Sequence, residues 1–425
     1  MKHTFSEMRC CQSSKITVPN IIHFIWIGNT NEANLKYIDI WRRTNKEKVI
    51  YFWHDESFSL CADFHKAIHE YVLSQDNEDK ISFEINLKNK AFDYIFPKVT
   101  QGYSFDELVL KFLSANYIPF CKKSKNKLNS WFAVNDIIVK NIDDVFNHDF
   151  FDFKKYYCYE IILRGNIASA SDIVRLLIIY IYGGIYMDVD TLPQTNYIFK
   201  ETNKFIIKEK IIEDDFMLLF KTMCILNRLS HIDLEKHQYF MHYRESVGKE
   251  KEEYNTILSL IEHDIADFSV KDISPLGEIY VHKNLLSVGS IKRLKGIYFN
   301  NFIASHKNAK ILRIILRNMN KRYRFLEKNE CIFQMYKDDK SKEYLTRLLT
   351  WRTELFTRNY SVTTALTGPG LIVETMLGLA YELLNVNKLT DPRYIAEYMQ
   401  NDTFGIAFFK YNIDTPDGAK STWQK

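Results

Sequence analysis

Two aspartates with the spacing of a metal site, Asp188 and Asp190, lie on either side of a valine. They follow an apolar run and the pair Gly183 and Gly184. Mg²⁺ and Mn²⁺ prefer hard oxygen ligands and usually sit between one or two carboxylates and the phosphates of a substrate. If residues 186–190 form a strand, both side chains project to the same face. The pair therefore indicates either a metal-assisted site for a phosphorylated ligand or two exposed aspartates at a strand end.

A second candidate pair, Asp172 and Arg175, lies upstream in a stretch with helical spacing of apolar residues. Residues three apart share one face of a helix. A carboxylate can bind sugar hydroxyls, and a guanidinium can bind a diphosphate through two parallel hydrogen bonds. These two side chains could therefore bind a ligand with sugar hydroxyls and a diphosphate, but taken by themselves they favour a plain intrahelical ion pair.

The elements that must position these side chains follow from the hydrophobic pattern. Residues 20–28 and 48–53 are apolar runs rich in β-branched and aromatic residues, which predicts buried strands of a parallel sheet. The stretch 35–45 between them has the pattern of a helix, so the three segments open a βαβ unit. The sequence therefore predicts an α/β fold.

The helix before the aspartates is expected to start near Ser171 or Asp172 and to end at Gly183. Residues 186–190 would then form a short strand. Downstream, residues 304–327 and 341–358 have the pattern of amphipathic helices. Two ranges, 56–160 and 200–290, are expected to be large helical insertions in this core.

Composition narrows the class of protein. With 57 basic and 53 acidic side chains the formal net charge is +4, which gives no sign of a nucleic-acid-binding domain. The seven cysteines show no repeated spacing, so neither a disulfide framework nor a zinc ribbon is indicated. The N-terminus lacks the apolar region of a secretory signal. The longest apolar run, residues 176–187, is too short to span a bilayer, so no transmembrane segment is expected.

Several segments resemble a known family. The stretch ASDIVRLLIIYIYGGIYMDVDTLP, residues 170–193, is similar to the DXD-containing segment of glycosyltransferases, especially the glucosyltransferase domains of large clostridial toxins and related bacterial effector glycosyltransferases. IIHFIWIGNTNEANLKYIDIW, residues 21–41, resembles the first strand and helix of that family. TTALTGPG, residues 363–370, resembles its SGP turn, and STW, residues 421–423, resembles its Ser-x-Trp lid. These segments come in the family's order.

The resemblance implies a GT-A type, Rossmann-like nucleotide-sugar-binding core within a single glycosyltransferase domain over residues 1–425. The two helical insertions would form the acceptor-binding region. The implied enzyme is a metal-dependent, retaining hexosyltransferase. It would move glucose or GlcNAc from UDP-glucose or UDP-GlcNAc to a hydroxyl of a host protein, with a small GTPase as the leading acceptor. A toxin or effector of this kind would leave a bacterium without a recognisable signal peptide and act in the host cell cytosol.

The resemblance also implies roles for individual residues. Trp26 would stack on the uracil ring, and Ser171 and Tyr186 would help to hold the nucleoside. Asp172 would bind sugar hydroxyls, and Arg175 would contact sugar and phosphate. Asn300, in the segment FNNFIASHK, would lie near the sugar.

The metal, Mn²⁺ or Mg²⁺, would be held at the other end of the donor. Asp190 would ligate it directly, and Asp188 would contact the ribose and the water shell of the metal. Ser421 would complete the metal shell, with Asp417 as an additional acidic candidate. Trp423 would touch the β-phosphate or the glycosidic oxygen as the C-terminal lid closes and excludes water.

Two other functions remain open. A sugar transferase for bacterial surface polysaccharide would share the DXD segment and would act on a saccharide acceptor. A catalytically silent module would bind a nucleotide or a GTPase without turning over a UDP-sugar. A labelled sugar distinguishes these functions. The host-directed enzyme would label a protein, the polysaccharide transferase would label a saccharide, and the silent module would transfer no label.

Overall fold

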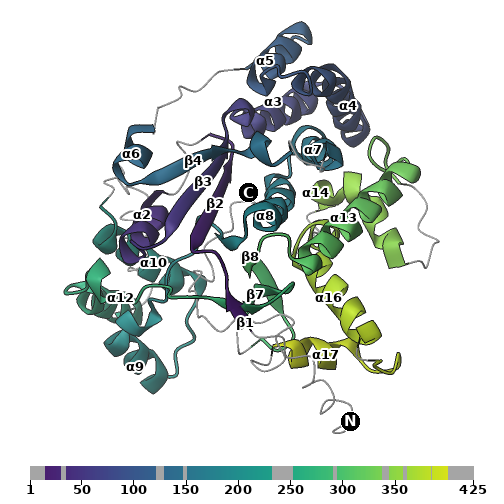
Figure 1. Ribbon diagram of the computed structural model, residues 1–425. Helices are drawn as coiled ribbons and strands as arrows, with labels where there is room; N and C mark the ends of the chain where they lie inside the picture. The colour runs from purple at the N-terminus through teal and green to yellow at the C-terminus, as the bar shows by residue number, and fades with distance from the viewer. Residues whose placement is uncertain are drawn as a thin grey trace. The chain divides into compact units, whose positions relative to one another are not determined.

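The computed structural model describes most of the chain (Figure 1). The described residues are 15–29, 35–120, 129–146, 151–231, 252–290, 294–336, 344–357, 361–383 and 385–400. They divide into two compact units. The first unit takes its described residues from 15–29, 49–187 and 278–400, and the second from 35–48 and 188–277. The assignment of residues 1–425 to a single glycosyltransferase domain stays a prediction.

The first unit is built on a six-stranded mixed sheet with the strand order β4-β3-β2-β5-β8-β7. β4, β3, β2 and β5 are parallel, and β8 joins β5 as an antiparallel strand, followed by β7. A separate antiparallel pair joins β1 to β6. The strands are β1 (Lys15–Thr17), β2 (Ile21–Ile27), β3 (Val49–Asp55), β4 (Ile137–Asn141), β5 (Gly184–Met187), β6 (Tyr280–His282), β7 (Leu286–Ser290) and β8 (Tyr298–Ser305).

The two apolar runs at the start of the chain form neighbouring parallel strands, as their composition predicted. In β2 the successive residues Phe24 and Ile25 are buried, and in β3 the successive residues Phe52 and Trp53 are buried. Strands buried on both faces need apolar residues in succession rather than in alternation. The expected βαβ opening and α/β class are therefore confirmed.

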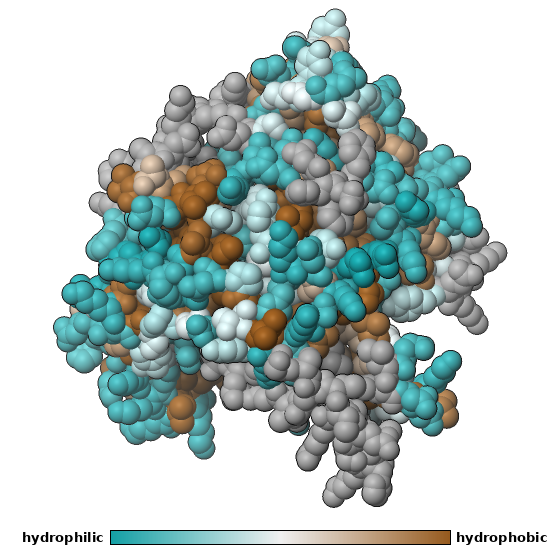
Figure 2. Space-filling view, in the orientation of Figure 1, coloured by the Kyte–Doolittle hydropathy of each residue, from teal (hydrophilic) through white to brown (hydrophobic). Residues whose placement is uncertain are grey.

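The edge strand β4 is the exception to this burial. Together with α6 (Asn129–Val134) it carries an exposed apolar area at the upper left of Figure 2. Its exposed residues are Val134, Ile138 and Val139. β4 lies within the range 56–160, so this range contributes a strand to the sheet as well as helices.

Helices of the first unit pack into one large apolar cluster with the sheet. The early group comprises α3 (Cys61–Ser74), α4 (Lys80–Val99), α5 (Phe105–Ala115) and α7 (Phe151–Cys158), which continues into a π-helical segment, Tyr159–Arg164. The later group comprises α8 (Ile167–Tyr182), α13 (Lys310–Lys328), α14 (Glu354–Thr357), α15 (Ser361–Leu366), α16 (Pro369–Leu383) and α17 (Pro392–Met399). No helix in these described ranges is long and apolar enough to cross a bilayer.

Three of the expected helices differ from the structure in their bounds or type. The helix predicted from residue 304 starts only at Lys310, because β8 continues to Ser305. The helix predicted over 341–358 is a 3₁₀ helix, Tyr344–Arg352, followed by the short α14. The helix predicted to start near Ser171 starts at Ile167, because the side chain of Asn166 caps it by accepting from the Ser169 amide at 3.0 Å.

Gly183 ends α8 as predicted, with a φ of +69° that other residues adopt at a cost. A Cβ atom at this position would also lie 2.7 Å from the Lys307 nitrogen and 2.9 Å from Pro19. The chain therefore needs glycine here to turn from α8 directly into β5.

The second unit is a small helical assembly with its own apolar cluster. It contains α2 (Leu35–Thr44), α9 (Lys200–Lys208), α10 (Asp215–Leu229) and α12 (Glu252–Ile265). Asp264 on α12 accepts from the Thr202 amide at 2.8 Å and from the Thr202 hydroxyl at 2.7 Å, which ties α12 to the first turn of α9. The described part of the range 200–290 is thus helical in this unit, while β6 and β7 belong to the first.

Candidate active site

Asp172 and Arg175 lie on one face of α8 and form an ion pair, with 3.3 Å between Arg175 Nη2 and Asp172 Oδ1. Both side chains are nearly buried. The helical spacing by itself favoured such an ion pair over a ligand site. Whether the pair can also bind a ligand depends on the contacts that other elements make with these two residues.

Asn300 on β8 connects both members of the pair. Its side-chain amide donates to Asp172 Oδ1 at 2.8 Å, and its backbone carbonyl accepts from Arg175 Nη1 at 2.7 Å. β8 pairs with β5 only as far as Met187, which lies opposite Phe302, so Asn300 belongs to the part of β8 that extends past the end of β5. The strand pairing therefore brings Asn300 to the pair on α8, and its place near a donor sugar stays a prediction.

Arg175 has two further neighbours that the resemblance named. Its guanidinium carbon lies 4.4 Å from the ring centre of Tyr186 on β5, which is a cation–π contact. Its Nη2 donates to Ser171 Oγ at 3.2 Å. Tyr186 is 2% exposed, so its ring supports Arg175 from within the fold rather than presenting a face to solvent. The planar guanidinium is thus fixed by contacts on its face and along its edge.

Thr367, which lies between α15 and α16, belongs to this cluster and was not predicted from the sequence. Its hydroxyl donates to Asp172 Oδ2 at 3.0 Å. The segment TTALTGPG resembles a family turn, but nothing in its sequence shows that Thr367 contacts a carboxylate on α8. Four described residues from three separate parts of the chain thus meet at one carboxylate and one guanidinium, Asp172, Arg175, Asn300 and Thr367.

Trp26 lies near the carboxyl end of β2, next to β5. In this pairing His23 is opposite Tyr186, and Trp26 follows three residues later. Trp26 is half-buried, and its indole N–H donates to the Asn29 carbonyl at 2.9 Å. Parallel strands in α/β sheets bind ligands beyond their carboxyl ends, which is the edge where Trp26 and Tyr186 lie. The described structure shows no contact that assigns Trp26 to a base.

His23 locks the start of β5 to the sheet. Its Nε2 donates to the Gly183 carbonyl at 2.8 Å, and its Nδ1 accepts from the Trp53 indole N–H at 3.0 Å. The ring is completely buried, and burial lowers the pKa of His23 to about 4. His23 is therefore neutral near pH 7 and holds the glycine turn that leads into β5.

Asp188 and Asp190 follow β5 directly in the chain and belong to the second unit. The expectation that they continue the strand was wrong, because β5 ends at Met187 and a turn closes where the Thr191 amide donates to the Asp188 carbonyl at 3.1 Å. The indole N–H of Trp41 on α2 anchors this turn by donating to the Thr191 carbonyl at 2.6 Å. The spacing of the two aspartates is therefore set by a turn rather than by strand alternation.

Both aspartates are half-buried. Tyr37 on α2 lies close enough to Asp190 for the charge to matter, since the pKa of Tyr37 is raised first by burial and then by the carboxylate of Asp190. Their oxygens are the donors that Mg²⁺ and Mn²⁺ prefer. Within the residues the structure describes, no group of three or more His, Cys, Asp or Glu side chains could hold a metal ion.

The remaining predicted site residues, Asp417, Ser421 and Trp423, lie outside the described residues. A metal shell that combines Asp188 and Asp190 with them stays a prediction, and so does the lid formed by Trp423.

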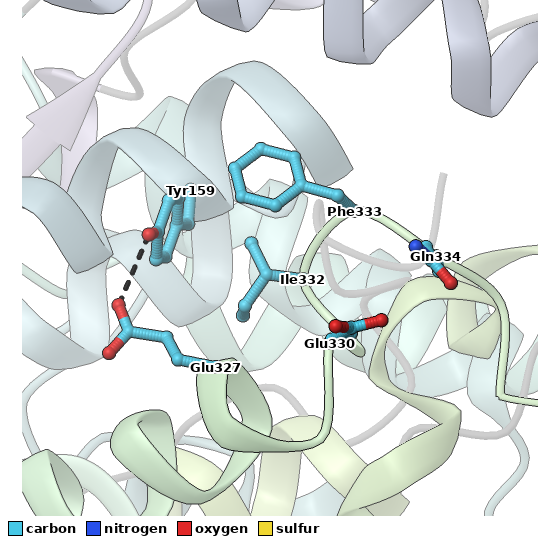
Figure 3. Close-up of a pocket in the computed structure, with 6 residues that line it drawn as sticks. All are labelled: Tyr159, Glu327, Glu330, Ile332, Phe333 and Gln334. Carbon is cyan, nitrogen blue, oxygen red and sulfur yellow. Dashed lines mark hydrogen bonds between the residues drawn. The ribbon is translucent and has the colours of Figure 1, made fainter.

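A cavity in the first unit has a lining separate from the cluster around Asp172 (Figure 3). It encloses about 400 Å³ around the end of α13 and the segment after it. The Tyr159 hydroxyl donates to Glu327 Oε1 at 3.1 Å on one side. The lining residues are Tyr159, Glu327, Glu330, Ile332, Phe333 and Gln334. None of them contributes a group to the cluster around Asp172.

Three curated toxins are similar to the chain in sequence. Toxin A of Clostridium novyi is 26% identical over 364 residues, which cover 78% of this chain and 16% of that toxin. Cytotoxin-L of Paraclostridium sordellii is 29% identical over 231 residues, 47% of this chain and 10% of that toxin. Toxin B of Clostridioides difficile is 27% identical over 234 residues, 48% of this chain and 10% of that toxin. The chain thus spans a sixth or less of the length of these relatives.

Two solved structures share the fold. The catalytic domain of alpha-toxin from Clostridium novyi matches with a TM-score of 0.67 at 18% identity, over 99% of this chain and 82% of that one. The UDP-bound glycosyltransferase domain of the YGT toxin matches with a TM-score of 0.60 at 14% identity, over 96% of this chain and 82% of that one. The expected GT-A fold is therefore confirmed. The family pattern of the TcdA/TcdB catalytic glycosyltransferase domain matches residues 20–377. Because that match covers most of the chain, including β2, α8, β5 and β8, the protein belongs to the TcdA/TcdB glycosyltransferase domain family.

Proposed function

We propose that this glycosyltransferase moves a hexose, glucose or GlcNAc, from a UDP-sugar to a hydroxyl of a host protein, with retention of configuration and with Mn²⁺. The observation that carries the proposal is the cluster of Asp172, Arg175 and Asn300 at the carboxyl edge of the parallel strands. A carboxylate beside a guanidinium suits a ligand that has sugar hydroxyls next to a diphosphate. A small GTPase is the proposed acceptor, and the host cell cytosol is the proposed place of action.

In this proposal each side chain does one task. Asp172 accepts hydrogen bonds from hydroxyls of the sugar, and its fixed carboxylate sets the orientation of the ring. Arg175 binds the sugar–phosphate end of the donor and stabilises the negative charge that develops on the leaving diphosphate. Trp26 offers an indole face to the uracil ring. Asn300 holds Asp172 and Arg175 in register with each other.

Asp188 and Asp190 are the residues that would hold the metal, with Ser421 and Asp417 as the further proposed ligands. When bound, a divalent cation neutralises charge on the diphosphate as it leaves. Trp423 would cover the leaving group and limit hydrolysis by water. The acceptor hydroxyl would attack from the face that the diphosphate leaves, so no protein nucleophile is assigned. The ranges 56–160 and 200–290 would form the acceptor-binding region.

The test uses the full chain with Mn²⁺, a panel of labelled UDP-sugars and a host-cell lysate. Label is expected on a protein band from one donor, and mass spectrometry of that band identifies the acceptor and the modified hydroxyl. A lysate without the enzyme and an Asp190→Asn variant are the controls. Label on a saccharide in place of a protein would favour the surface-polysaccharide alternative. Neither transfer nor hydrolysis of any UDP-sugar would favour a silent binding module.

A further inference from the structure

Three side-chain contacts attach α15 and the turn after it to α8. Asn166, the N-cap of α8, donates to Thr363 Oγ1 at 2.7 Å. One turn further along α8, the Ser169 hydroxyl lies 2.8 Å from that of Thr367. One turn further again, Asp172 accepts from Thr367. Asn166, Ser169 and Asp172 are three apart and share one face of α8. This face contacts Thr363 and Thr367, which are four apart on the facing segment.

Thr367 is completely buried, and the acceptor of its hydroxyl proton can be identified. The nearest acceptor that cannot itself donate is the carboxylate of Asp172 at 3.0 Å, whereas the Thr363 carbonyl is 3.4 Å away. An ionised carboxylate only accepts hydrogen bonds. Thr367 therefore donates to Asp172, and the Ser169 hydroxyl donates to Thr367. Hydrogen bonds to a charged acceptor are stronger than those between neutral groups.

The carboxylate of Asp172 is consequently held on both oxygens by separate parts of the fold. Asn300 on β8 donates to Oδ1, and Thr367 donates to Oδ2. Arg175 also contacts Oδ1, at 3.3 Å, so Thr367 is the contact named here that reaches Oδ2. Contacts on one oxygen restrain rotation about the Cβ–Cγ bond less than contacts on both, because this torsion has a broad energy minimum. Contacts on both oxygens together hold the plane of the carboxylate.

The position of Thr367 is itself set by a tight turn. The amides of Thr367 and Gly368 both donate to the Thr363 carbonyl, at 3.2 and 3.1 Å. A Cβ atom at Gly370 would lie 2.8 Å from the Thr364 carbonyl oxygen, so the segment TGPG folds back more closely than a larger residue there would allow. Glu354 holds the start of the turn by accepting from the Thr363 hydroxyl at 2.6 Å.

We propose that Thr367 is a positioning residue for the donor sugar, acting through Asp172. The inference rests on the proposed function, in which Asp172 binds sugar hydroxyls. Thr367 does not touch the donor. It fixes the orientation of the carboxylate that does, and this gives the TGPG turn a task in recognising the hexose rather than the uridine diphosphate.

The experiment compares Thr367→Val, which removes the hydroxyl at nearly constant volume, with Thr367→Ser, which keeps it. The matched control is Thr375→Val on α16, since Thr375 is similarly buried and accepts from Asn318 at 3.0 Å. The readouts are kcat/KM for Mn²⁺-dependent hydrolysis of the UDP-sugar, the Kd for UDP alone, and the melting temperature. Thr367→Val should lower kcat/KM roughly tenfold or more with a less than twofold change in the Kd for UDP. Thr367→Ser should restore most of the activity, and Thr375→Val should leave both values unchanged.

The inference is overturned if Thr367→Val keeps full activity, if it weakens UDP binding as much as turnover, or if serine does not rescue. A crystal structure of Thr367→Val gives a readout that does not depend on turnover. The carboxylate of Asp172 should lose its single orientation there, and an unchanged carboxylate would contradict the positioning role. If the wild type hydrolyses no UDP-sugar, the proposed function fails, and this structural result still decides whether Thr367 orients Asp172. If Thr367→Val does not fold, Thr367→Ser decides. Serine keeps the hydroxyl, so the folded variant should keep most of the wild-type kcat/KM, and a tenfold loss of kcat/KM at an unchanged melting temperature would overturn the proposal.

Discussion

The side-chain amide of Asn300 lies 2.8 Å from the carboxylate of Asp172, although the two residues are 128 positions apart in the chain. The contact exists because β8 runs antiparallel to β5 and extends past its end. Asn300 also binds Arg175 through its carbonyl. Asn300 thus contacts both the Asp172 carboxylate and the Arg175 guanidinium, the two charged groups that the proposed donor site needs.

Replacing Asn300 with Ala should lower kcat/KM for UDP-sugar hydrolysis by about 10- to 100-fold. The substitution removes a hydrogen bond to a charged group, which is worth about 1.5–3 kcal/mol. The Arg175 contact should survive, because it uses the backbone of residue 300. Steady-state kinetics with the UDP-sugar measure the fall in kcat/KM. Calorimetry with UDP measures whether the retained Arg175 contact keeps the affinity for UDP. Asn318→Ala, which removes an amide on α13, is the control. Unchanged kinetics of Asn300→Ala would remove this residue from the site.

Arg175→Lys should reduce activity by about 100-fold, a loss comparable to that of one electrostatic stabiliser of a transition state. The charge is kept, but lysine lacks the planar fork that reaches Ser171, Asp172 and the Asn300 carbonyl at once. It also loses the flat contact with the Tyr186 ring. Kinetics and thermal unfolding of the variant should show a much larger loss of turnover than of stability.

The control for Arg175→Lys is Arg324→Lys, because Arg324 forms an exposed ion pair with Asp152. Exposed pairs contribute little to stability and nothing to this site. Near-normal activity of Arg175→Lys would show that a point charge is sufficient and that the stacked geometry has no part in turnover.

Asp188→Asn and Asp190→Asn should each weaken Mn²⁺ binding and abolish Mn²⁺-dependent hydrolysis. Asparagine keeps the size of the side chain but removes the negative charge that a divalent cation requires. Paramagnetic resonance of free Mn²⁺ gives a binding curve that needs no substrate. Asp267→Asn, at an exposed position of the same unit, is the control. Wild-type Mn²⁺ affinity in both variants would place the metal elsewhere.

Features that depend on residues close together in the chain were predicted correctly from the sequence. The two buried strands, the end of α8 at Gly183 and the shared face of Asp172 and Arg175 are local consequences of apolar spacing, glycine and helix geometry. Asn300 was identified only through a resemblance, since nothing in its own segment shows that β8 pairs with β5.

Two features could not be predicted because distant contacts or turn geometry decide them. Thr367 reaches Asp172 across 195 positions, and a threonine in a turn carries no local sign of such a contact. The turn from Asp188 to Thr191 replaces the expected strand, and Trp41 on α2 helps to hold it. Strand alternation and a turn both tolerate the same three residues, so the pattern alone does not distinguish them.

Acid should weaken the first unit through His23. Burial lowers the pKa of the folded-state ring to about 4, whereas the unfolded value is near 6.5. Between these two pH values the unfolded chain takes up a proton that the folded chain does not, so the free energy of unfolding falls as the pH falls. The full contribution is present above about pH 6.5, and it amounts to roughly 3 kcal/mol across this window.

The measurement is urea unfolding of the wild type and of His23→Gln at several pH values from 4 to 7. Glutamine can still donate to the Gly183 carbonyl, but it does not titrate. The difference in the free energy of unfolding between the two proteins should therefore change with pH in the direction that favours His23→Gln in acid. Asp55, whose pKa burial raises to about 6, contributes a slope of the opposite sign, and this slope cancels because both proteins contain it. His263→Gln, at an exposed position on α12, should show no such change. A constant difference between wild type and His23→Gln would mean that the buried imidazole is not the group that titrates, and the lock on Gly183 would then be insensitive to acid.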